Sequence, residues 1–205
     1  MRIYACSSNA GKLKDFAAAA HQAGLQDLSI EPLPNIKSIP APEETGSTFE
    51  HNAVLKALYY SGFTSELVLA DDSGLAVDAL HGAPGVLSAR YAGPEATDQE
   101  NNSLLLRDLS ASAHREARFI CVLALAQHHQ LLGTQRGVVE GCVLFSPRGH
   151  NGFGYDPLFW YPPLKRSFGE LSPQEKFAVS HRGNAIRALW RELPRMLSSV
   201  SAQQK

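Results

Sequence analysis

A long apolar run over residues 117–126 constrains the fold more than any other feature of this sequence. Almost every residue in it is apolar, which fits a central strand buried on both faces better than one with a solvated face. A second run over 137–145 follows a polar turn at 128–130, and the pair predicts a long antiparallel ribbon. Shorter strands are expected at 3–7, 28–33, 67–70, 74–79 and 157–160, with helices at 12–23, 47–60, 97–109 and 180–197. This alternation predicts an α/β fold with a mixed sheet flanked by helices.

Three segments have the spacing of a helix capping box, in which a hydroxyl is followed three residues later by a carboxylate. They begin at Ser47, Thr97 and Ser172, and the third also has a proline at the first helical position. Each segment predicts the start of a helix.

Length and composition limit the classes of protein that this chain can represent. With 205 residues, one domain over 1–197 is expected, followed by a polar tail over 198–205. The 19 basic and 20 acidic residues offer no broad basic face for nucleic acid. No apolar run approaches the roughly 20 residues that cross a bilayer, and the first residues lack the anatomy of a signal peptide. Three separated cysteines in apolar stretches indicate reduced thiols and a cytoplasmic location.

The stretch over 70–93 has the strongest signature of a functional site. Asp71 and Asp72 follow an apolar strand and precede Ser73-Gly74, which is typical of a turn. Carboxylates at the end of a strand in an α/β protein suit a hard divalent cation. If the strand persists, adjacent acids point opposite ways, so we expect only one of them to bind the ion.

Two further segments carry charge that suits phosphates. Residues 7–12, SSNAGK, form a strand-to-helix turn whose backbone N–H groups and lysine can cradle a phosphate. Glu44 precedes a helix on which Asn52 and Lys56 are four residues apart and share a face. A solvated loop and ordinary helix-surface residues are the structural alternatives for these two segments.

Two late segments suit a planar, polar ligand. In the loop over 147–157, glycines flank Phe153 and leave its ring free to stack on a base, while Asp156 can accept hydrogen bonds. Lys176 lies shortly before His181 and Arg182, which place two donors next to each other at a helix start. A hairpin loop and a surface charge cluster are the alternatives here.

Taken together, these segments resemble the inosine triphosphate pyrophosphatase family. The resemblance rests on SSNAGK, EETGSTFEHNAVLKA, ADDSGLAVDAL with GAPGVLSARYAG, PRGHNGFGYDPLF and KFAVSHRGNA, which occur in the family's order between Ser7 and Ala185. One departure is Ser7-Ser8, where family members often have Thr-Gly or Thr-Ser, but Ser7 retains the hydroxyl.

The resemblance implies a two-lobed fold with a cleft between the lobes, a homodimer, and Mg²⁺-dependent hydrolysis of ITP, dITP and XTP to a monophosphate and pyrophosphate. It implies Glu44 and Asp72 as Mg²⁺ ligands, with Asp72 as the proton acceptor for the attacking water. The residues implied to contact the substrate are Ser7, Ser8, Asn9, Ala10, Gly11, Lys12, Lys56, Ser73, Phe153, Gly154, Tyr155, Asp156, Lys176, His181 and Arg182.

Substrate selection has a physical explanation in this scheme. His181 and Arg182 would donate hydrogen bonds to the 6-keto oxygen of inosine or xanthine but would face another donor in the 6-amino group of adenine. Such mispairing can discriminate by about 10⁴–10⁵ in a dry pocket. A pyrophosphatase for a modified pyrimidine nucleotide and a nucleotide sensor without catalysis are the two alternative functions.

Overall fold

The computed structural model describes residues 1–7, 9–22 and 28–203. The chain divides into two compact units. Unit 1 comprises Met1–Asp72, Cys121–Gly137 and Arg182–Lys205, and unit 2 comprises Ser73–Ile120 and Val138–His181. The chain therefore alternates between the units, and neither unit is one continuous segment.

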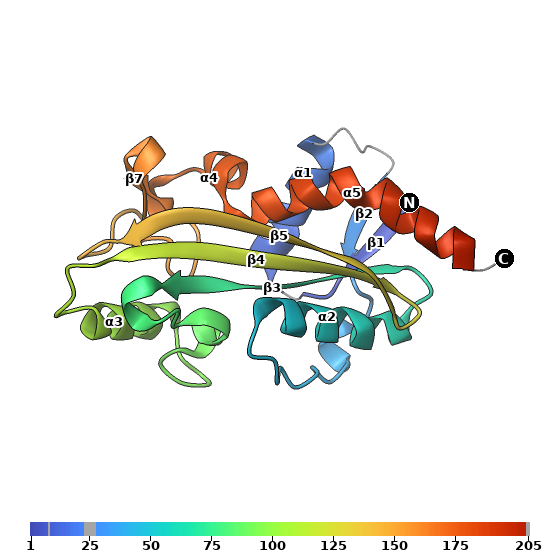
Figure 1. The fold of residues 1–205 in the computed structure, drawn as a ribbon, viewed down its shortest axis with the longest axis horizontal. Coiled ribbons are helices and arrows are strands. Elements are labelled where there is room, and N and C mark those ends of the chain that lie inside the picture. Colours follow the sequence, from blue (N-terminus) through green and yellow to red (C-terminus); the bar gives the residue numbers. More distant parts are fainter. Residues whose placement is uncertain (8, 23–27, 204–205) are drawn as a thin grey trace. The chain divides into compact units, whose positions relative to one another are not determined.

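Within the described ranges, the strands form a seven-stranded sheet in the order β2-β1-β3-β4-β5-β6-β7 (Figure 1). In unit 1, β1 (Arg2–Ala5) runs parallel to β2 (Ser29–Pro32) and to the first part of β3 (Leu67–Val77). In unit 2, the end of β5 (Gln130–Val143) pairs antiparallel with β6 (Phe159–Tyr161), which pairs with β7 (Arg166–Ser167). The predicted α/β fold with a mixed sheet is confirmed.

The helices of unit 1 lie on both faces of its strands. Figure 1 shows α1 (Ala10–Gln22) and α5 (His181–Gln203) on one side and α2 (Phe49–Tyr60) on the other. Tyr4, Leu33, Tyr60 and Val68 form a buried cluster in this unit. Burial on both faces explains why β3 reads as an unbroken apolar run before its two aspartates.

In unit 2, α3 (Asp98–Asp108) and α4 (Pro173–Val179) lie on opposite sides of the strands (Figure 1). The core between them includes stacked and tilted aromatic rings, with Phe119 4.6 Å from Phe159 and 5.9 Å from Phe168 between centroids. Both helices begin at capping boxes, formed by Thr97 with Glu100 and by Ser172 with Glu175. These two boxes confirm the sequence prediction.

The predicted box at Ser47 is wrong. Thr48 caps α2 instead, and its hydroxyl accepts a hydrogen bond from the backbone N–H of His51. Glu50, which the box would have used, accepts a hydrogen bond from Thr134 at 2.9 Å. The helix nevertheless spans Phe49–Tyr60 within the predicted range, because Thr is also a favourable N-cap residue.

The expected turn at Ser73-Gly74 is also wrong, because β3 continues through it to Val77. A Cβ on Gly74 would collide with the Ser88 side chain and would lie 2.6 Å from the carbonyl oxygen of Gly85. Gly74 therefore allows another backbone segment to approach an extended strand closely. A close approach of this kind is a common reason for a glycine inside a strand. Two short predicted strands are one long strand, with Asp71 and Asp72 in it.

The antiparallel ribbon is longer than expected. β4 (Glu116–Gln127) joins β5 through His128 and His129, both with positive φ, as a two-residue hairpin turn of type I′ requires. β5 begins at Gln130 rather than at 137. The polar residues at the start of β5 made the strand difficult to predict from sequence. One of its glycines, Gly133, lies where a Cβ would meet the side chain of Met196.

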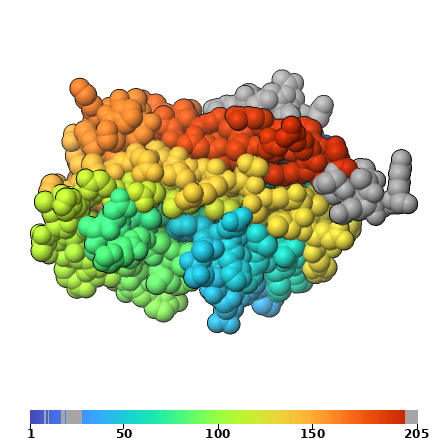
Figure 2. Space-filling view, in the orientation of Figure 1, coloured from blue at the N-terminus to red at the C-terminus, as the bar shows by residue number. Residues whose placement is uncertain are grey.

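Helix α5 extends past its predicted end at residue 197, through Pro194, to Gln203. Its buried residues recur on one face at helical spacing: Ala185, Ile186, Leu189, Trp190, Leu193 and Met196. The solvent-facing side of the helix forms the red surface in Figure 2. None of the helices in the described ranges is long and apolar enough to cross a membrane.

Candidate active site

The two adjacent aspartates of β3 are both buried and bind different lysines. Asp71 Oδ2 lies 2.9 Å from Lys12 Nζ, and Asp72 Oδ1 lies 2.9 Å from Lys56 Nζ. Asp71 and Asp72 are 4% and 8% exposed, respectively. The prediction that the two carboxylates point opposite ways is confirmed, since successive side chains of a strand alternate between its faces.

Lys12 comes from the start of α1, where Asn9 organises the turn. The Asn9 side-chain oxygen accepts hydrogen bonds from the backbone N–H groups of Gly11 and Lys12, at 2.9 and 3.1 Å. The backbone N–H of Asn9 in turn donates to Ser7 Oγ at 3.1 Å. The sequence predicts these helix-start N–H groups as a phosphate cradle, whereas the structure shows two of them already bound by a strong N-cap residue. Ala10 is the first residue of α1, and Ser8 lies outside the described residues.

Lys56 joins two carboxylates that come from different segments. Its ammonium lies 3.0 Å from Glu44 Oε1 as well as 2.9 Å from Asp72 Oδ1. Asn52, one helical turn earlier, donates to Asp72 at 3.4 Å and accepts from the backbone N–H of Gly46 at 2.8 Å. The shared helix face of Asn52 and Lys56 is confirmed. Through Asn52, the loop that carries Glu44 is tied to the strand that carries Asp72.

The environment perturbs the ionisation of this cluster in a specific way. Burial raises the pKa of Asp72, and the attraction of Lys56 does not fully offset that effect. Burial alone would lower the pKa of Lys56, but the charges of Asp72, Asp71 and Glu44 outweigh it and raise that pKa. The lysine stays charged, while Asp72 becomes a stronger base than an exposed aspartate.

The pKa of Asp71 is shifted in the opposite direction from that of Asp72. Burial would raise its pKa, but the charges of Lys12, Arg182 and Lys56 outweigh burial and lower the pKa to about 2. Arg182 is itself 2% exposed and donates to Asp15 Oδ2 at 2.8 Å, with its other terminal nitrogen 4.0 Å from Asp71. Asp71 is therefore a fixed negative charge that organises cations.

Asp15 was not predicted as part of the site. It lies three residues after Lys12 on α1 and therefore on a similar face of the helix, which is the one sequence signal that could have indicated it. Its partner Arg182 is 167 residues away.

The donor set of unit 1 fits a hard divalent cation. Glu44 and Asp72 each place an oxygen within about 3 Å of one ammonium, so both already converge on a single positive charge. Mg²⁺ in proteins keeps several waters and takes only one or two carboxylates, so two are sufficient. Among the described residues, no group of three or more His, Cys, Asp or Glu side chains could hold a metal ion. The two carboxylates therefore fit a divalent cation that keeps most of its waters.

Unit 2 holds a second cluster of predicted residues in the loop before β6. Asp156, 2% exposed, binds Lys176 Nζ at 2.5 Å and accepts from the backbone N–H of Phe153 at 2.8 Å. The same ammonium lies 4.6 Å from the centroid of the Phe153 ring, a cation–π contact. Phe153 is 38% exposed, a large fraction for an aromatic residue held this firmly. The loop presents an ordered aromatic surface.

Tyr155 connects this loop to the GAPGVLSARYAG segment. Its hydroxyl donates to the carbonyl oxygen of Ser88 at 2.8 Å. Ser88 Oγ accepts from the backbone N–H of Leu75 at 2.9 Å and donates to Gly85 at 2.6 Å. Ser88 thus joins the Tyr155 loop to β3. Ser73 precedes this contact on β3 and is partly buried.

His181 and Arg182, the two adjacent donors of the sequence prediction, make different contacts in the structure. The His181 ring stacks on Phe119, with centroids 4.7 Å apart and planes 16° apart. Arg182 binds the carboxylates of unit 1, and the boundary between the units falls between the two residues. The predicted residues therefore form one charged cluster in unit 1 and one aromatic cluster in unit 2.

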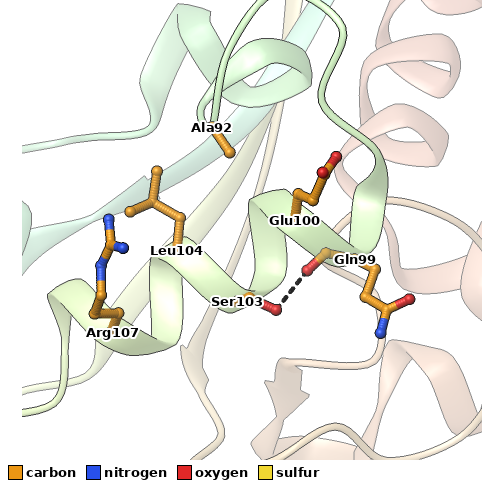
Figure 3. Close-up of a pocket in the computed structure, with 6 residues that line it drawn as sticks. All are labelled: Ala92, Gln99, Glu100, Ser103, Leu104 and Arg107. Atoms are coloured by element: carbon orange, nitrogen blue, oxygen red, sulfur yellow. Dashed lines mark hydrogen bonds between the residues drawn. The ribbon is translucent and has the colours of Figure 1, made fainter.

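A surface pocket of about 540 Å³ lies along α3, in a place that the sequence did not predict (Figure 3). It is lined by Ala92, Gln99, Glu100, Ser103, Leu104 and Arg107. None of the predicted site residues lines it.

Known proteins with similar sequences and structures share one family. The sequence model of the Ham1 family matches residues 3–192. A dITP/XTP pyrophosphatase of Exiguobacterium sp. is 47% identical over 94% of this chain and 97% of its own, and one of Desulforamulus reducens is 44% identical over 96% and 97%. A HAM1 protein from Coxiella burnetii has a TM-score of 0.85 at 41% identity, covering 95% of this chain and 99% of its own. The Ham1 protein of Staphylococcus aureus has a TM-score of 0.83 at 38% identity, covering 95% and 98%. The recognition made from the sequence is confirmed: the chain belongs to the Ham1 family.

Proposed function

We infer that this protein hydrolyses the non-standard purine nucleoside triphosphates ITP, dITP and XTP to the monophosphate and pyrophosphate. Family membership and relatives named dITP/XTP pyrophosphatase at 44–47% identity support the reaction class. The observation that carries the proposal is the convergence of Glu44 and Asp72 on Lys56, because a pair of carboxylates beside a lysine suits a metal-assisted attack on a triphosphate.

The charged cluster of unit 1 is proposed to hold the triphosphate. The residues assigned to this task are Ser7, Ser8, Asn9, Ala10, Gly11, Lys12 and Lys56. Lys12 and Lys56 each pair with a buried carboxylate in the structure, so both ammonium groups are fixed in place before substrate arrives. Fixed cations stabilise developing negative charge without reorganising, which is where electrostatic catalysis gains most.

Glu44 and Asp72 are proposed to hold Mg²⁺. When bound, the ion neutralises phosphate charge and so favours the approach of water. Asn52 supports this arrangement, since its hydrogen bonds to Gly46 and Asp72 keep the two carboxylate-bearing segments together.

Asp72 is proposed as the proton acceptor for the attacking water. The water loses a proton to the Asp72 carboxylate, and its oxygen forms a bond to a phosphorus of the α–β anhydride. The bond from that phosphorus to the bridging oxygen breaks, and the products are the monophosphate and pyrophosphate. The raised pKa of Asp72 supports this role, because a base whose pKa is closer to neutrality takes up a proton more readily.

The aromatic cluster of unit 2 is proposed to bind the nucleoside. Phe153 offers the stacking surface, and Gly154, Tyr155, Asp156 and Lys176 shape the loop around it. Ser73, His181 and Arg182 complete the proposed contacts, and the last two are proposed to donate hydrogen bonds to the 6-keto oxygen of the base. Arg182 also pairs with Asp15, so it is proposed to stabilise the charged cluster as well as to contact the base.

Two further parts of the proposal concern the setting of the enzyme. We place it in the cytoplasm, where nucleoside triphosphates are found, and its three cysteines are free thiols. We also propose a homodimer, as the resemblance implies.

The test is pyrophosphate release from ITP, XTP, ATP, GTP and dUTP, with Mg²⁺ and with a chelator. We expect Mg²⁺-dependent release from ITP and XTP that is lost in Glu44→Gln and Asp72→Asn and kept in Glu43→Gln, a matched control at an exposed neighbour. Release from dUTP alone would support the proposed reaction but contradict the proposed purine substrates. Tight binding of ITP with no release would leave a nucleotide sensor.

A further inference from the structure

Helix α3 binds both backbone polar groups of Gly154, the residue after Phe153. Asp98 Oδ2 accepts from the Gly154 N–H at 2.6 Å, and Asn102 Nδ2 donates to the Gly154 carbonyl at 3.0 Å. Asp98 and Asn102 are four residues apart, so one face of the helix makes both bonds. We call this pair of contacts the Gly154 clamp.

The clamp requires the special backbone of Gly154. The residue has φ of 60°, in the left-handed region, and a Cβ added to it would meet nothing within 4 Å. Glycine is therefore needed here for its conformation and not for space. The bond from a carboxylate to the N–H is short and charge-assisted, which makes it stronger than an ordinary surface hydrogen bond.

The helix that makes the clamp is itself firmly placed. Its first turn is fixed by the Thr97–Glu100 capping box, and Leu105 and Leu109 at its far end are fully buried. Asn101, 3% exposed, binds the backbone of Ala89 and Ala92 in the segment that carries Ser88. The carbonyl oxygen of Ser88 accepts a hydrogen bond from the Tyr155 hydroxyl. Through this segment, α3 also supports the loop indirectly.

Phe153 is held through its backbone N–H by Asp156 and over its ring by Lys176, and these partners lie on the loop and on α4, respectively. The clamp adds two direct hydrogen bonds from α3 to the residue that follows Phe153. It therefore controls the direction in which the chain leaves Phe153, and with it the tilt of the exposed ring.

We propose that Asp98 and Asn102 are positioning residues that set the Phe153 ring for stacking on the nucleobase. This inference rests on the proposed function, in which Phe153 is the stacking surface. Neither residue belongs to the substrate contacts assigned above. They act on the substrate only through Gly154.

The proposal predicts a particular kinetic signature. The nucleobase does not change during hydrolysis, so a contact with it is equally strong in the ground state and in the transition state. Loss of such a contact raises KM and leaves kcat unchanged. A hydrogen bond to a charged group contributes enough that we expect KM for ITP to rise about tenfold in Asp98→Ala.

The experiment compares five proteins by kcat and KM for ITP: wild type, Asp98→Ala, Asp98→Asn, Asn102→Ala and the control Gln99→Ala. Asp98→Asn keeps an oxygen acceptor, so its KM should lie between those of wild type and Asp98→Ala. Gln99 lies on the same helix but lines the pocket of Figure 3, and its substitution should leave KM within twofold of wild type. A fall in kcat at unchanged KM, or an equal effect of Gln99→Ala, would overturn the proposal.

A second measurement does not depend on activity. Amide hydrogen exchange over residues 151–157 should be about tenfold faster in Asp98→Ala than in wild type, with unchanged exchange in β4. Unchanged exchange in the loop would refute the clamp whatever the enzyme acts on. If wild type releases no pyrophosphate from any purine nucleotide while the loop exchange changes as expected, the proposed function fails and the clamp stands.

Discussion

Neutralising each of the two adjacent aspartates of β3 in turn is expected to change the stability of the protein by different amounts. Asp71→Asn and Asp72→Asn remove the same charge from neighbouring, buried positions and keep the side-chain shape. The pKa of Asp71 is lowered to about 2, so the folded protein stabilises its ionised form, whereas the pKa of Asp72 is raised, so folding disfavours its ionised form. Removing the charge should therefore destabilise the protein at Asp71 and not at Asp72.

The loss of stability expected in Asp71→Asn follows from the pKa of Asp71. A decrease from 3.8 to about 2 corresponds to about 2 kcal/mol of stability, since a tenfold change in an equilibrium is about 1.4 kcal/mol. In a protein of this size that is about 4–8 °C in Tm. Because the folded pKa lies below the unfolded one, this stability is present above about pH 4 and is lost as the pH falls toward about 2.

The pKa values of Asp72 and Lys56 are both raised, but the two increases have opposite meanings. A raised pKa means that the fold favours the charged form of the lysine and disfavours the charged form of the aspartate. The increase at Lys56 reflects Asp71 and Glu44 as well as Asp72, so it does not measure this pair alone. The pKa of Asp72 itself decides what its neutralisation does. We therefore expect Asp72→Asn to keep the wild-type Tm within about 2 °C.

The assay is thermal unfolding at pH 7 in chelator, together with pyrophosphate release from ITP with Mg²⁺. Asp72→Asn should lose about 10²–10⁴ in kcat, the usual contribution of a general base, with its Tm unchanged. Asp71→Asn should lose Tm. Equal losses of Tm in the two variants, or a larger loss at Asp72, would refute the assignment of Asp71 as the structural charge.

Three further predictions concern other residues. Gly74→Ala should destabilise the protein by about 1–3 kcal/mol in urea unfolding, because its Cβ collides with Ser88 and lies 2.6 Å from the Gly85 carbonyl oxygen; an unchanged midpoint would contradict the close approach. Tyr155→Phe should cost about 1 kcal/mol by the same assay, since the Ser88 carbonyl loses its donor, and a neutral result would show that water replaces it. Burial raises the pKa of Cys121 to about 12, so iodoacetamide at pH 8 should label this thiol only in urea, and rapid native labelling would contradict its burial.

Periodicity was sufficient to predict the internal geometry of the charged cluster. A strand alternates its side chains, so adjacent aspartates were expected to face different partners if the strand persisted through them, as the lysines at Asp71 and Asp72 confirm. A helix repeats every three to four residues, so Asn52 and Lys56 had to share a face. Local rules of this kind need no knowledge of the tertiary fold.

Contacts that depend on chain segments distant in sequence were not predictable. Ser73-Gly74 has the composition of a turn, but the approach of Ser88 requires glycine inside an extended strand. Asp98 accepts a hydrogen bond from a backbone N–H that is 56 residues away. Every residue except proline has such an N–H, so the sequence does not indicate which one a side chain binds. The helix-start N–H groups of residues 7–12 were predicted to cradle a phosphate, yet the Asn9 side chain binds two of them.

The pairing of Asp15 and Asp71 with Arg182 also has a consequence for synthesis of the chain. Arg182 follows Asp15 by 167 residues, which is roughly 10–30 s of translation at about 5–20 residues per second. Until α5 has been made, the buried carboxylate of Asp71 and the partly buried one of Asp15 lack this guanidinium, and a buried charge with an incomplete set of partners opposes folding. We therefore expect unit 1 to reach its stable arrangement only after α5 has been synthesised.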